Sequence, residues 1–286
     1  MSAVIDIALP LLIVLAMLVV GLELTPADLA QALRFPLQVV VGLLGQLTAL
    51  PLLAAGLIML LRPEASVAGG LILAAASPQA MSSNFFTLLG RANVALSVTL
   101  TAFSSVLALA ATPLIAKFGF TLLLDREARV ALPVGAVMLQ VATGLLLPVT
   151  AGMLVRYCAP GFVHRNHVRL QHLSLVALGS LLLLILLDQA GTIQRNLWSI
   201  VTLAVLFTLG AAAVGWGIAR ALGWTRGDAV TLVVALPSRS LSVAALVALN
   251  VLGRTDFLAF AAPFFVVQTL LLLPVLWRAR APSLPG

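Results

Sequence analysis

The sequence predicts an all-α membrane protein with about nine transmembrane helices, two of them interrupted. Of the 286 residues, 62% are hydrophobic and only 9% are charged, and the mean hydropathy is +1.17. A soluble domain carries roughly 25% charged residues, so this chain lacks the side chains that a water-facing surface needs. Pro78 and Pro237 each lie inside an apolar segment, beside a cluster of small polar residues. Paired breaks of this kind are typical of the binding site of a secondary transporter.

The predicted spans follow from the length of the apolar stretches, because a helix needs about 20 apolar residues to cross a bilayer. The stretches cover residues 4–21, 37–61, 67–89, 93–116, 131–157, 172–188, 197–221, 229–249 and 257–277. No Lys or Arg precedes the first stretch. A secretory signal peptide begins with positive charge, so we expect this stretch to be a retained span.

The charged residues between the spans predict the orientation. The connection at residues 156–172, which we expect to be a solvated loop, carries Arg156, Arg165 and Arg169. If this connection is inside the cell, the inner side has more Lys and Arg, and the acids gather on the outer side. Cytoplasmic segments carry this excess of cations. We therefore expect a multi-pass protein of the inner (plasma) membrane with a cytoplasmic C-terminus.

The sequence disfavours several other classes of protein. The net charge is +7, but the cations sit singly between apolar runs, which indicates topology and lipid contacts rather than nucleic-acid binding. Cys158 is the only cysteine, and the histidines of the 156–172 connection have no carboxylate or cysteine among them, so no metal site or cofactor is expected. No His or acid at membrane depth could activate a Ser, so we expect no enzyme. Gly69-Gly70 is expected to be a helix-packing pair.

Polar oxygens gather after the first break and on the following span. Ser83 and Asn84 follow the break, and Ser97 and Thr101 are four residues apart, so they share one helix face. Hydroxyl, amide and unwound carbonyl oxygens are the ligands that hard cations prefer. An isolated Ser in a membrane helix more often bonds to backbone or to a neighbouring helix. A Ser-Asn pair beside a break, followed by a Ser-x-x-x-Thr face, favours an ion site.

This segment resembles the bile acid:sodium symporter family. Residues 77–84, then 90–97 and Thr101, are similar to the family's pattern of a proline, small residues, Ser-Asn and Arg-Gly-Asn-Val-Ala-Leu-Ser. Upstream, residues 21–29 resemble its Gly-Leu-x-Leu-x-x-x-Asp segment, and Gln46 and Pro51 fall where it has a Gln and a Pro. The resemblance extends over most of the chain and is most specific in residues 77–101.

The resemblance implies a ten-helix inverted-repeat fold, in which two broken helices cross inside a core domain that faces a smaller panel domain. On this mapping the chain begins at the family's second helix. Residues 1–21 and 131–188 would form the panel domain, and residues 37–116 and 197–277 the core domain. Substrate would bind in the cleft between the domains, which would move relative to each other to give alternating access.

The resemblance also implies two sodium sites, and this sequence departs from both. Ser83, Asn84, Ser97 and Thr101 match ligands of the first site, and Gln46 matches a ligand of the second. Val234 stands where the family has the Glu that both sites share, Ser238 where it has a Gln, and Arg239 where it has an Asn. We therefore expect sodium coupling to be altered or absent.

Arg239 has two candidate roles at the crossover, the region that also contains Pro78, Pro237, Ser238 and Ser240. A charged side chain inside a span costs roughly 2.5–3.5 kcal/mol, so a functional role is favoured over a long reach to the interface. Arg239 could replace the coupling cation, with Gln46, Ser83, Asn84, Thr101 and unwound carbonyls as acceptors. It could instead bind a substrate carboxylate or sulfate through two hydrogen bonds.

Together these features predict a secondary transporter of small organic anions that works by alternating access. Steroid-like acids, vitamin-like acids and short keto acids all fit the sequence, which does not indicate an oligomeric state. Two alternatives stay open: an exchanger of another solute class, and a non-transporting membrane sensor or scaffold that kept the fold.

Overall fold

The computed structural model describes residues 11–22 (except 16 and 20), 35–124 and 134–280, and every regular element in these ranges is a helix. Five of the helices are long and apolar enough to cross a membrane, namely Pro36–Leu61, Val94–Leu123, Val134–Cys158, Ala190–Ala221 and Thr255–Trp277. The chain is therefore a multi-pass membrane protein. Residues 4–10 of the first predicted span, 131–133 of the fifth, and the part of the family-like segment after Leu22 lie outside the described residues.

The described elements follow one another in a simple order. They are α3 (Pro36–Leu44), η2 (Gly45–Ala49), α4 (Leu50–Leu61), α5 (Ala65–Ala76), α6 (Ser82–Leu89), α7 (Val94–Leu123), α8 (Val134–Val141), η3 (Ala142–Leu146), α9 (Leu147–Cys158), α10 (Pro160–Asp188), α11 (Ala190–Ala221), α12 (Arg226–Ala235), α13 (Leu241–Leu246), η4 (Val247–Val251), η5 (Thr255–Phe257) and α14 (Leu258–Arg280). The elements η2 and η3 are π-helical turns inside longer helices, and η4 is a π-helical turn at the C-terminal end of the helix that begins with α13.

Two of the predicted spans are interrupted at their prolines. Helix α5 ends before Pro78 and α6 begins after it, while Pro237 separates α12 from α13. Proline lacks the N–H that continues a helix, and it disfavours the helical conformation of the preceding residue. Ser77 accordingly is extended, with φ −71° and ψ 151°. Each interrupted span therefore consists of two short half-helices, α5 and α6 in the first and α12 and α13 in the second.

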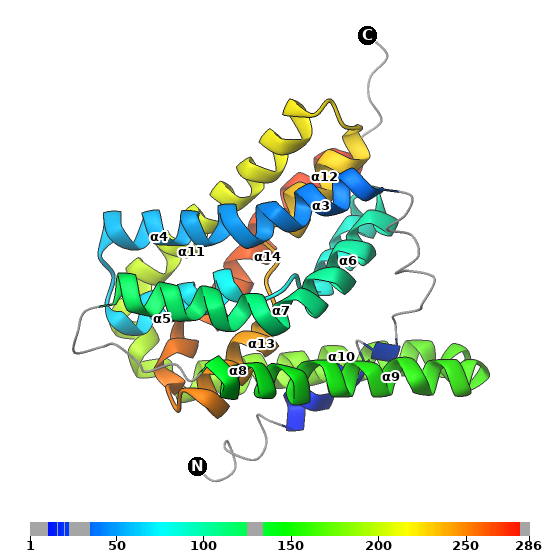
Figure 1. The fold of residues 1–286 in the computed structure, drawn as a ribbon, viewed down its shortest axis with the longest axis horizontal. Helices are drawn as coiled ribbons and strands as arrows, with labels where there is room; N and C mark the ends of the chain where they lie inside the picture. The colour runs from blue at the N-terminus through cyan, green and yellow to red at the C-terminus, as the bar shows by residue number, and fades with distance from the viewer. Residues whose placement is uncertain (1–10, 16, 20, 23–34, 125–133, 281–286) are drawn as a thin grey trace.

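The helices form two layers (Figure 1). Residues 11–22, α8, η3, α9 and α10 form one layer, which we call layer A, and the remaining helices form layer B. Inside layer A the backbones touch, because a Cβ atom on Gly152 would lie 2.2 Å from the carbonyl oxygen of Leu18. Layer A packs on layer B where α8 meets α7 and η4, and where α10 meets α14.

The prediction of a solvated loop at residues 156–172 is wrong for most of this segment. Helix α10 begins at Pro160 and continues without a break to Asp188. Proline is well tolerated in a first helical turn, because the N–H that it lacks would have no partner there. Only Leu175–Asp188 of this helix is apolar, so hydropathy identified its second half alone.

Close backbone contacts shape the interior of layer B. A Cβ atom on Gly70 would lie 2.3 Å from the carbonyl oxygen of Phe257, and one on Gly69 would overlap the Phe257 ring. The expectation that Gly69-Gly70 is a packing pair is thus confirmed. This contact fixes α5, and with it the first break, against η5 and α14.

Candidate functional site

The two breaks meet, as their paired prolines predict. Gln79 and Arg239 form an antiparallel β-bridge, in which the Ala80 N–H donates to Ser238 O at 2.9 Å and the Ser240 N–H donates to Pro78 O at 3.0 Å. In an apolar environment every unwound backbone group needs a partner of this kind. Each break therefore satisfies polar groups of the other.

Hydroxyl groups of α7 form hydrogen bonds with backbone groups at the first break. Ser104 Oγ accepts a hydrogen bond from the Gln79 N–H at 3.2 Å, and Thr112 Oγ1 donates to Ala76 O at 2.8 Å. Sequence reasoning missed both residues. The available signal was their spacing, since Ser97, Thr101, Ser104 and Thr112 all fall on one face of a helix.

A continuous chain of side-chain hydrogen bonds starts at the crossover. Arg239 Nη1 donates to Gln46 Oε1 at 3.4 Å, and Gln46 Nε2 donates to Gln79 Oε1 at 2.9 Å. Gln79 Nε2 then donates to Ser83 Oγ at 2.7 Å and lies 3.4 Å from Ser97 Oγ. We call these residues, together with Asn84 and Thr101, the polar relay. It joins α3–α4, both breaks and α7.

The four residues predicted from the Ser-Asn and Ser-x-x-x-Thr patterns are brought together in this relay. Asn84 Oδ1 accepts from Ser97 Oγ at 2.7 Å and from Thr101 Oγ1 at 3.1 Å. Ser83 and Ser97 are fully buried, and Thr101 is 1% exposed. Gln79 connects this group to Gln46, and it was not singled out from the sequence, although it is the one long polar side chain between Pro78 and Ser82.

Arg239 is buried against the C-terminal end of α5. Its guanidinium donates to the carbonyl oxygens of Ala74 (3.4 Å), Ala75 (3.5 Å) and Ser77, besides Gln46. Carbonyl groups at a helix C-terminus carry partial negative charge, so the cation is stabilised there without a carboxylate. The expected acceptors Gln46 and unwound carbonyls are correct.

The other expected acceptors of Arg239 were wrong. Ser83, Asn84 and Thr101 bond elsewhere in the polar relay and are linked to the guanidinium only through Gln46 and Gln79.

The remaining predicted residues shape the second break. Ser238 is fully buried and its Oγ donates to Val234 O at 2.7 Å, while Ser240 Oγ accepts from the Val243 N–H at 3.4 Å and caps α13. Pro237 is buried between α12 and Ser238. Val234, at the position where the resemblance implies a Glu, packs in an apolar cluster with Phe86, Leu272 and Leu276. These neighbours are not cation ligands.

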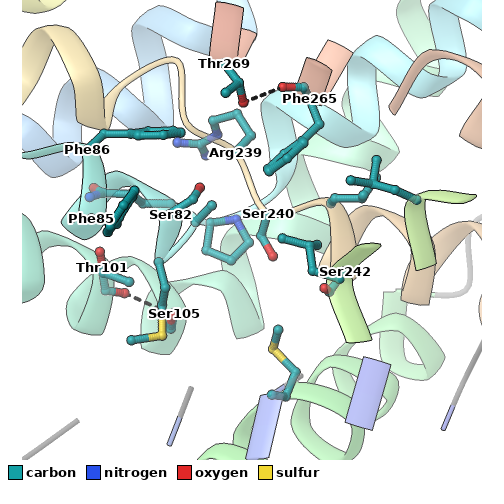
Figure 2. Close-up of a pocket in the computed structure, with 18 of the residues that line it drawn as sticks. Ser82, Phe85, Phe86, Thr101, Ser105, Arg239, Ser240, Ser242, Phe265 and Thr269 are labelled. Atoms are coloured by element: carbon teal, nitrogen blue, oxygen red, sulfur yellow. Dashed lines mark hydrogen bonds between the residues drawn. The ribbon is translucent and has the colours of Figure 1, made fainter. Parts of the chain in front are cut away.

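A cavity of about 520 Å³ lies between the two layers beside the crossover (Figure 2). Layer A contributes an apolar wall of Met17, Leu145, Leu175, Leu178, Gly179 and Leu182. Layer B contributes a more polar wall of Pro78, Gln79, Ala80, Met81, Ser82, Phe85, Phe86, Thr101, Ser105, Arg239, Ser240, Leu241, Ser242, Phe265 and Thr269.

The first residues of α6 and α13, Ser82 and Leu241, both line this cavity. Helix N-termini carry partial positive charge. In Figure 2, Phe85 and Phe86 stand across the cavity from Phe265, with the hydroxyl side chains of Ser240 and Ser242 nearby. The site therefore offers positive potential and hydroxyl groups on one wall and hydrocarbon on the other.

The fold and the site define a membrane protein in which two broken helices meet beside a cavity. Residues 10–196 match the Sodium Bile acid symporter family, and the chain belongs to this family.

Several curated relatives are similar to part of the chain. It is 36% identical over 138 residues to the uncharacterized sodium-dependent transporter YocS of Bacillus subtilis (strain 168), which covers 48% of this chain and 40% of YocS. It is 36% identical over 151 residues to the probable chloroplastic sodium/metabolite cotransporter BASS2 of Oryza sativa subsp. japonica, covering 52% of this chain and 34% of BASS2. The protein PA2026 of Pseudomonas aeruginosa is 31% identical over 183 residues, which is 61% of this chain and 53% of PA2026. The chain thus spans between about a third and a half of the length of these relatives.

Proposed function

We propose that the chain is a secondary transporter of small amphipathic organic anions that works by alternating access. The observation that carries this proposal is the cavity of about 520 Å³ between the layers, which receives the N-termini of two half-helices. The anionic group would lie at Ser82, Ser240 and Ser242, where the helix dipoles favour negative charge. The apolar body would rest on the leucines of layer A. The description of YocS as a sodium-dependent transporter supports transport, and that of BASS2 as a probable sodium/metabolite cotransporter supports a metabolite as the substrate.

We further propose that Arg239 replaces the coupling cation, so that transport does not need sodium. Its guanidinium already donates to carbonyl oxygens at the end of α5 and to Gln46, the residue that matches a ligand of the second sodium site. A second cation in the same relay would be repelled by it. The alternative role, binding of a substrate carboxylate by Arg239, is less well supported, because its N–H groups are directed at these internal acceptors.

The two layers fit the architecture implied by the family. We propose that layer A, with residues 1–21 and 131–188, is the panel domain and that layer B is the core domain, related by an inverted repeat. On this view the chain has nine spans, and its C-terminus is cytoplasmic. Movement of layer A against layer B would open the cavity to either side of the membrane.

The test is uptake of organic anions into proteoliposomes, measured in sodium buffer and in choline buffer. A panel of steroid-like, vitamin-like and keto acids would be compared with empty vesicles. We expect saturable uptake that is equal in the two buffers, and we expect Arg239→Asn to reduce uptake in choline. Arg195→Asn, at an exposed position, is the matched control.

Each result of this test has a defined meaning. Absence of any flux above that of empty vesicles, with the protein folded, would favour a sensor or scaffold. Flux of an uncharged solute alone would favour an exchanger of another class. A strict need for sodium in the native chain would reject the role of Arg239 while leaving transport intact.

A further inference from the structure

We propose that an anionic phospholipid binds in an open groove between α11, α12 and α14, with an acyl chain on the apolar walls and its phosphate at Arg226 and Arg220. The groove has a volume of about 430 Å³ and shares no residue with the cavity between the layers. It is lined by three alanines, three valines, Trp216 and Arg226. The inference does not depend on the transport proposal.

Arg226 is part of the wall of the groove. It is the first residue of α12, and the other lining residues of this helix follow it three, four and seven positions later, so all of them share one helix face. Asp228 belongs to a different face, because its carboxylate is buried and accepts a hydrogen bond from Asn93 Nδ2 at 2.8 Å. The groove face of α12 therefore begins with a cation and continues with hydrocarbon.

A second arginine lies at the same end of the groove. Arg220 Cζ is 5.4 Å from the ring centre of Trp216, which lines the groove. Gly215, six residues before the end of α11, packs on Leu232, six residues after the start of α12, and a Cβ atom on Gly215 would lie 2.7 Å from the Leu232 carbonyl oxygen. The two helices therefore form an antiparallel hairpin, with Arg220 and Arg226 both next to its connection.

The exposed surface of α11 shows what covers the groove. Leu209, Ala213 and Trp216 are exposed at spacings of four and three residues, so they form one stripe on a helix that is long and apolar enough to cross a membrane. In a bilayer such a stripe faces lipid chains. Trp side chains are enriched at the membrane–water interface, and arginines near helix ends extend to the same level. The arginine end of the groove is therefore at headgroup depth.

The charges at this end favour an anionic headgroup. The side chains of Arg220 and Arg226 are both exposed. A guanidinium group has five N–H donors, so Arg226 can bind a phosphate oxygen in addition to its interaction within the protein. The N-terminus of α12 carries partial positive charge, which disfavours an arginine in the first turn and favours an anion there. A phosphate would offset the repulsion between this helix end and the two guanidinium groups.

A bound lipid would stabilise the half-helix that leads into the second break. Val233 is the last residue of α12 that lines the groove, and the carbonyl oxygen of the next residue, Val234, accepts from Ser238 Oγ at 2.7 Å. A ligand that binds only the folded chain raises its stability in proportion to the logarithm of ligand concentration. Thermal stability therefore reports binding, whether or not transport is measured.

The test compares phospholipids with identical acyl chains and different headgroups. Purified protein in detergent is titrated with dioleoyl phosphatidylglycerol or dioleoyl phosphatidylcholine, and the melting temperature Tm is followed. With phosphatidylglycerol at about five times its dissociation constant, we expect a rise in Tm of roughly 2–4 °C. Phosphatidylcholine carries the same phosphate together with a quaternary ammonium group, which the arginines repel, so it should give a clearly smaller rise.

A groove-filling variant assigns the response to this place. Ala213→Phe introduces a ring at an exposed lining position, so it fills the groove without entering the packed interior. We expect it to lose the response to both lipids. Ala110→Phe is the matched control, because Ala110 is exposed on α7 and does not line the groove, and it should respond like the native chain.

A charge variant tests the headgroup preference. Arg220→Gln combined with Arg226→Gln should lower the phosphatidylglycerol response to that of phosphatidylcholine. The control Arg62→Gln combined with Arg195→Gln removes the same charge from exposed positions outside the groove, and it should keep the preference. If the first double variant does not fold, the Ala213→Phe result decides.

Three results would overturn the proposal: equal responses to the two lipids in the native chain, a full headgroup preference in the folded Arg220 and Arg226 double variant, or an unchanged response in Ala213→Phe protein. A second copy of the chain is the other occupant that an apolar groove can accept. A lipid-independent dimer that Ala213→Phe converts to a monomer, as measured by light scattering, would therefore also overturn it.

Discussion

At the scale of single residues, Arg239 combines two properties: a permanent charge and a planar fork of N–H donors. The fork bonds to acceptors on α5 and α3–α4, which are separated in sequence by about 30 residues. A Lys would keep the charge, but its compact ammonium group cannot bridge the same acceptors. Substitution by Lys therefore removes the fork of donors but keeps the positive charge, and substitution by Met removes both.

Substitutions of Arg239 should lower thermal stability in a graded order. We expect native protein to be more stable than Arg239→Lys, and Arg239→Lys to be more stable than Arg239→Met. Loss of the guanidinium leaves buried carbonyl groups without a donor, at about 1–3 kcal/mol for each group. Thermal unfolding in detergent measures the order. Equal melting temperatures for the Lys and Met variants would show that the charge contributes nothing.

Asn84 should be needed for transport, because its Oδ1 atom is the common acceptor for Ser97 and Thr101. Asn84 is partly buried but its donors Ser97 and Thr101 are buried, so loss of their common acceptor should cost about 1–3 kcal/mol and lower uptake by Asn84→Ala roughly tenfold. Asn166→Ala is the matched control, because that amide donates only to the backbone of its own helix, at Phe162 O. Similar uptake by both Asn variants would remove Asn84 from the site.

At the scale of elements, the position of α5 depends on a glycine contact. A Cβ atom on Gly70 would overlap the backbone of Phe257, whereas a Cβ atom on Gly56 of α4 would meet nothing within 4 Å. We expect Gly70→Ala to lose about 1–3 kcal/mol through overpacking. Gly56→Ala should be neutral or stabilising, since alanine favours helices by up to about 1 kcal/mol. Thermal unfolding of the two variants tests the contact, and similar shifts would refute it.

The sequence predicted the helix breaks better than the helix ends. Pro78 and Pro237, each beside small polar residues, mark both breaks. Proline alone does not end a helix here, since Pro113, Pro263 and Pro274 lie inside continuous helices. Residues 160–172 were assigned to a loop, since hydropathy reports polarity and this polar segment is still helical. The π-helical turns at Gly45–Ala49 and Ala142–Leu146 have no periodic signature over so few residues.

Within the site, residue types were easier to predict than contacts. The Ser-Asn pair and the Ser97–Thr101 face indicated a shared polar site, because helical spacing alone puts residues on one face. The central position of Gln79 depends on how the breaks pair, which local spacing does not determine. The hydroxyl support from Ser104 and Thr112 likewise depends on α7 packing against the first break.

At the scale of the whole molecule, transport by movement of the layers requires that the cavity walls separate. Leu178 of layer A and Ser82 of layer B line the same cavity. In a Cys158→Ser background, Leu178→Cys combined with Ser82→Cys should react with a bifunctional thiol reagent and lose uptake. The cross-linked double variant should lose more uptake than either single variant treated in the same way, which is the needed comparison because Ser82 and Leu178 themselves line the cavity. Undiminished flux in the cross-linked protein would exclude relative movement of the layers.

The β-bridge between the breaks also has a consequence for biosynthesis. Ser77 and Arg239 are 162 residues apart, so at 5–20 residues per second the ribosome needs roughly 8–30 s to supply the second break after the first. During this interval the Ala80 N–H and the Pro78 carbonyl have left the ribosome without their partners. The nascent chain is therefore exposed to membrane proteases and insertion chaperones until Ser238 and Ser240 arrive. In pulse-chase labelling, a chain truncated before Leu236 should be degraded faster than the full-length chain, and a truncation after Arg280 should not.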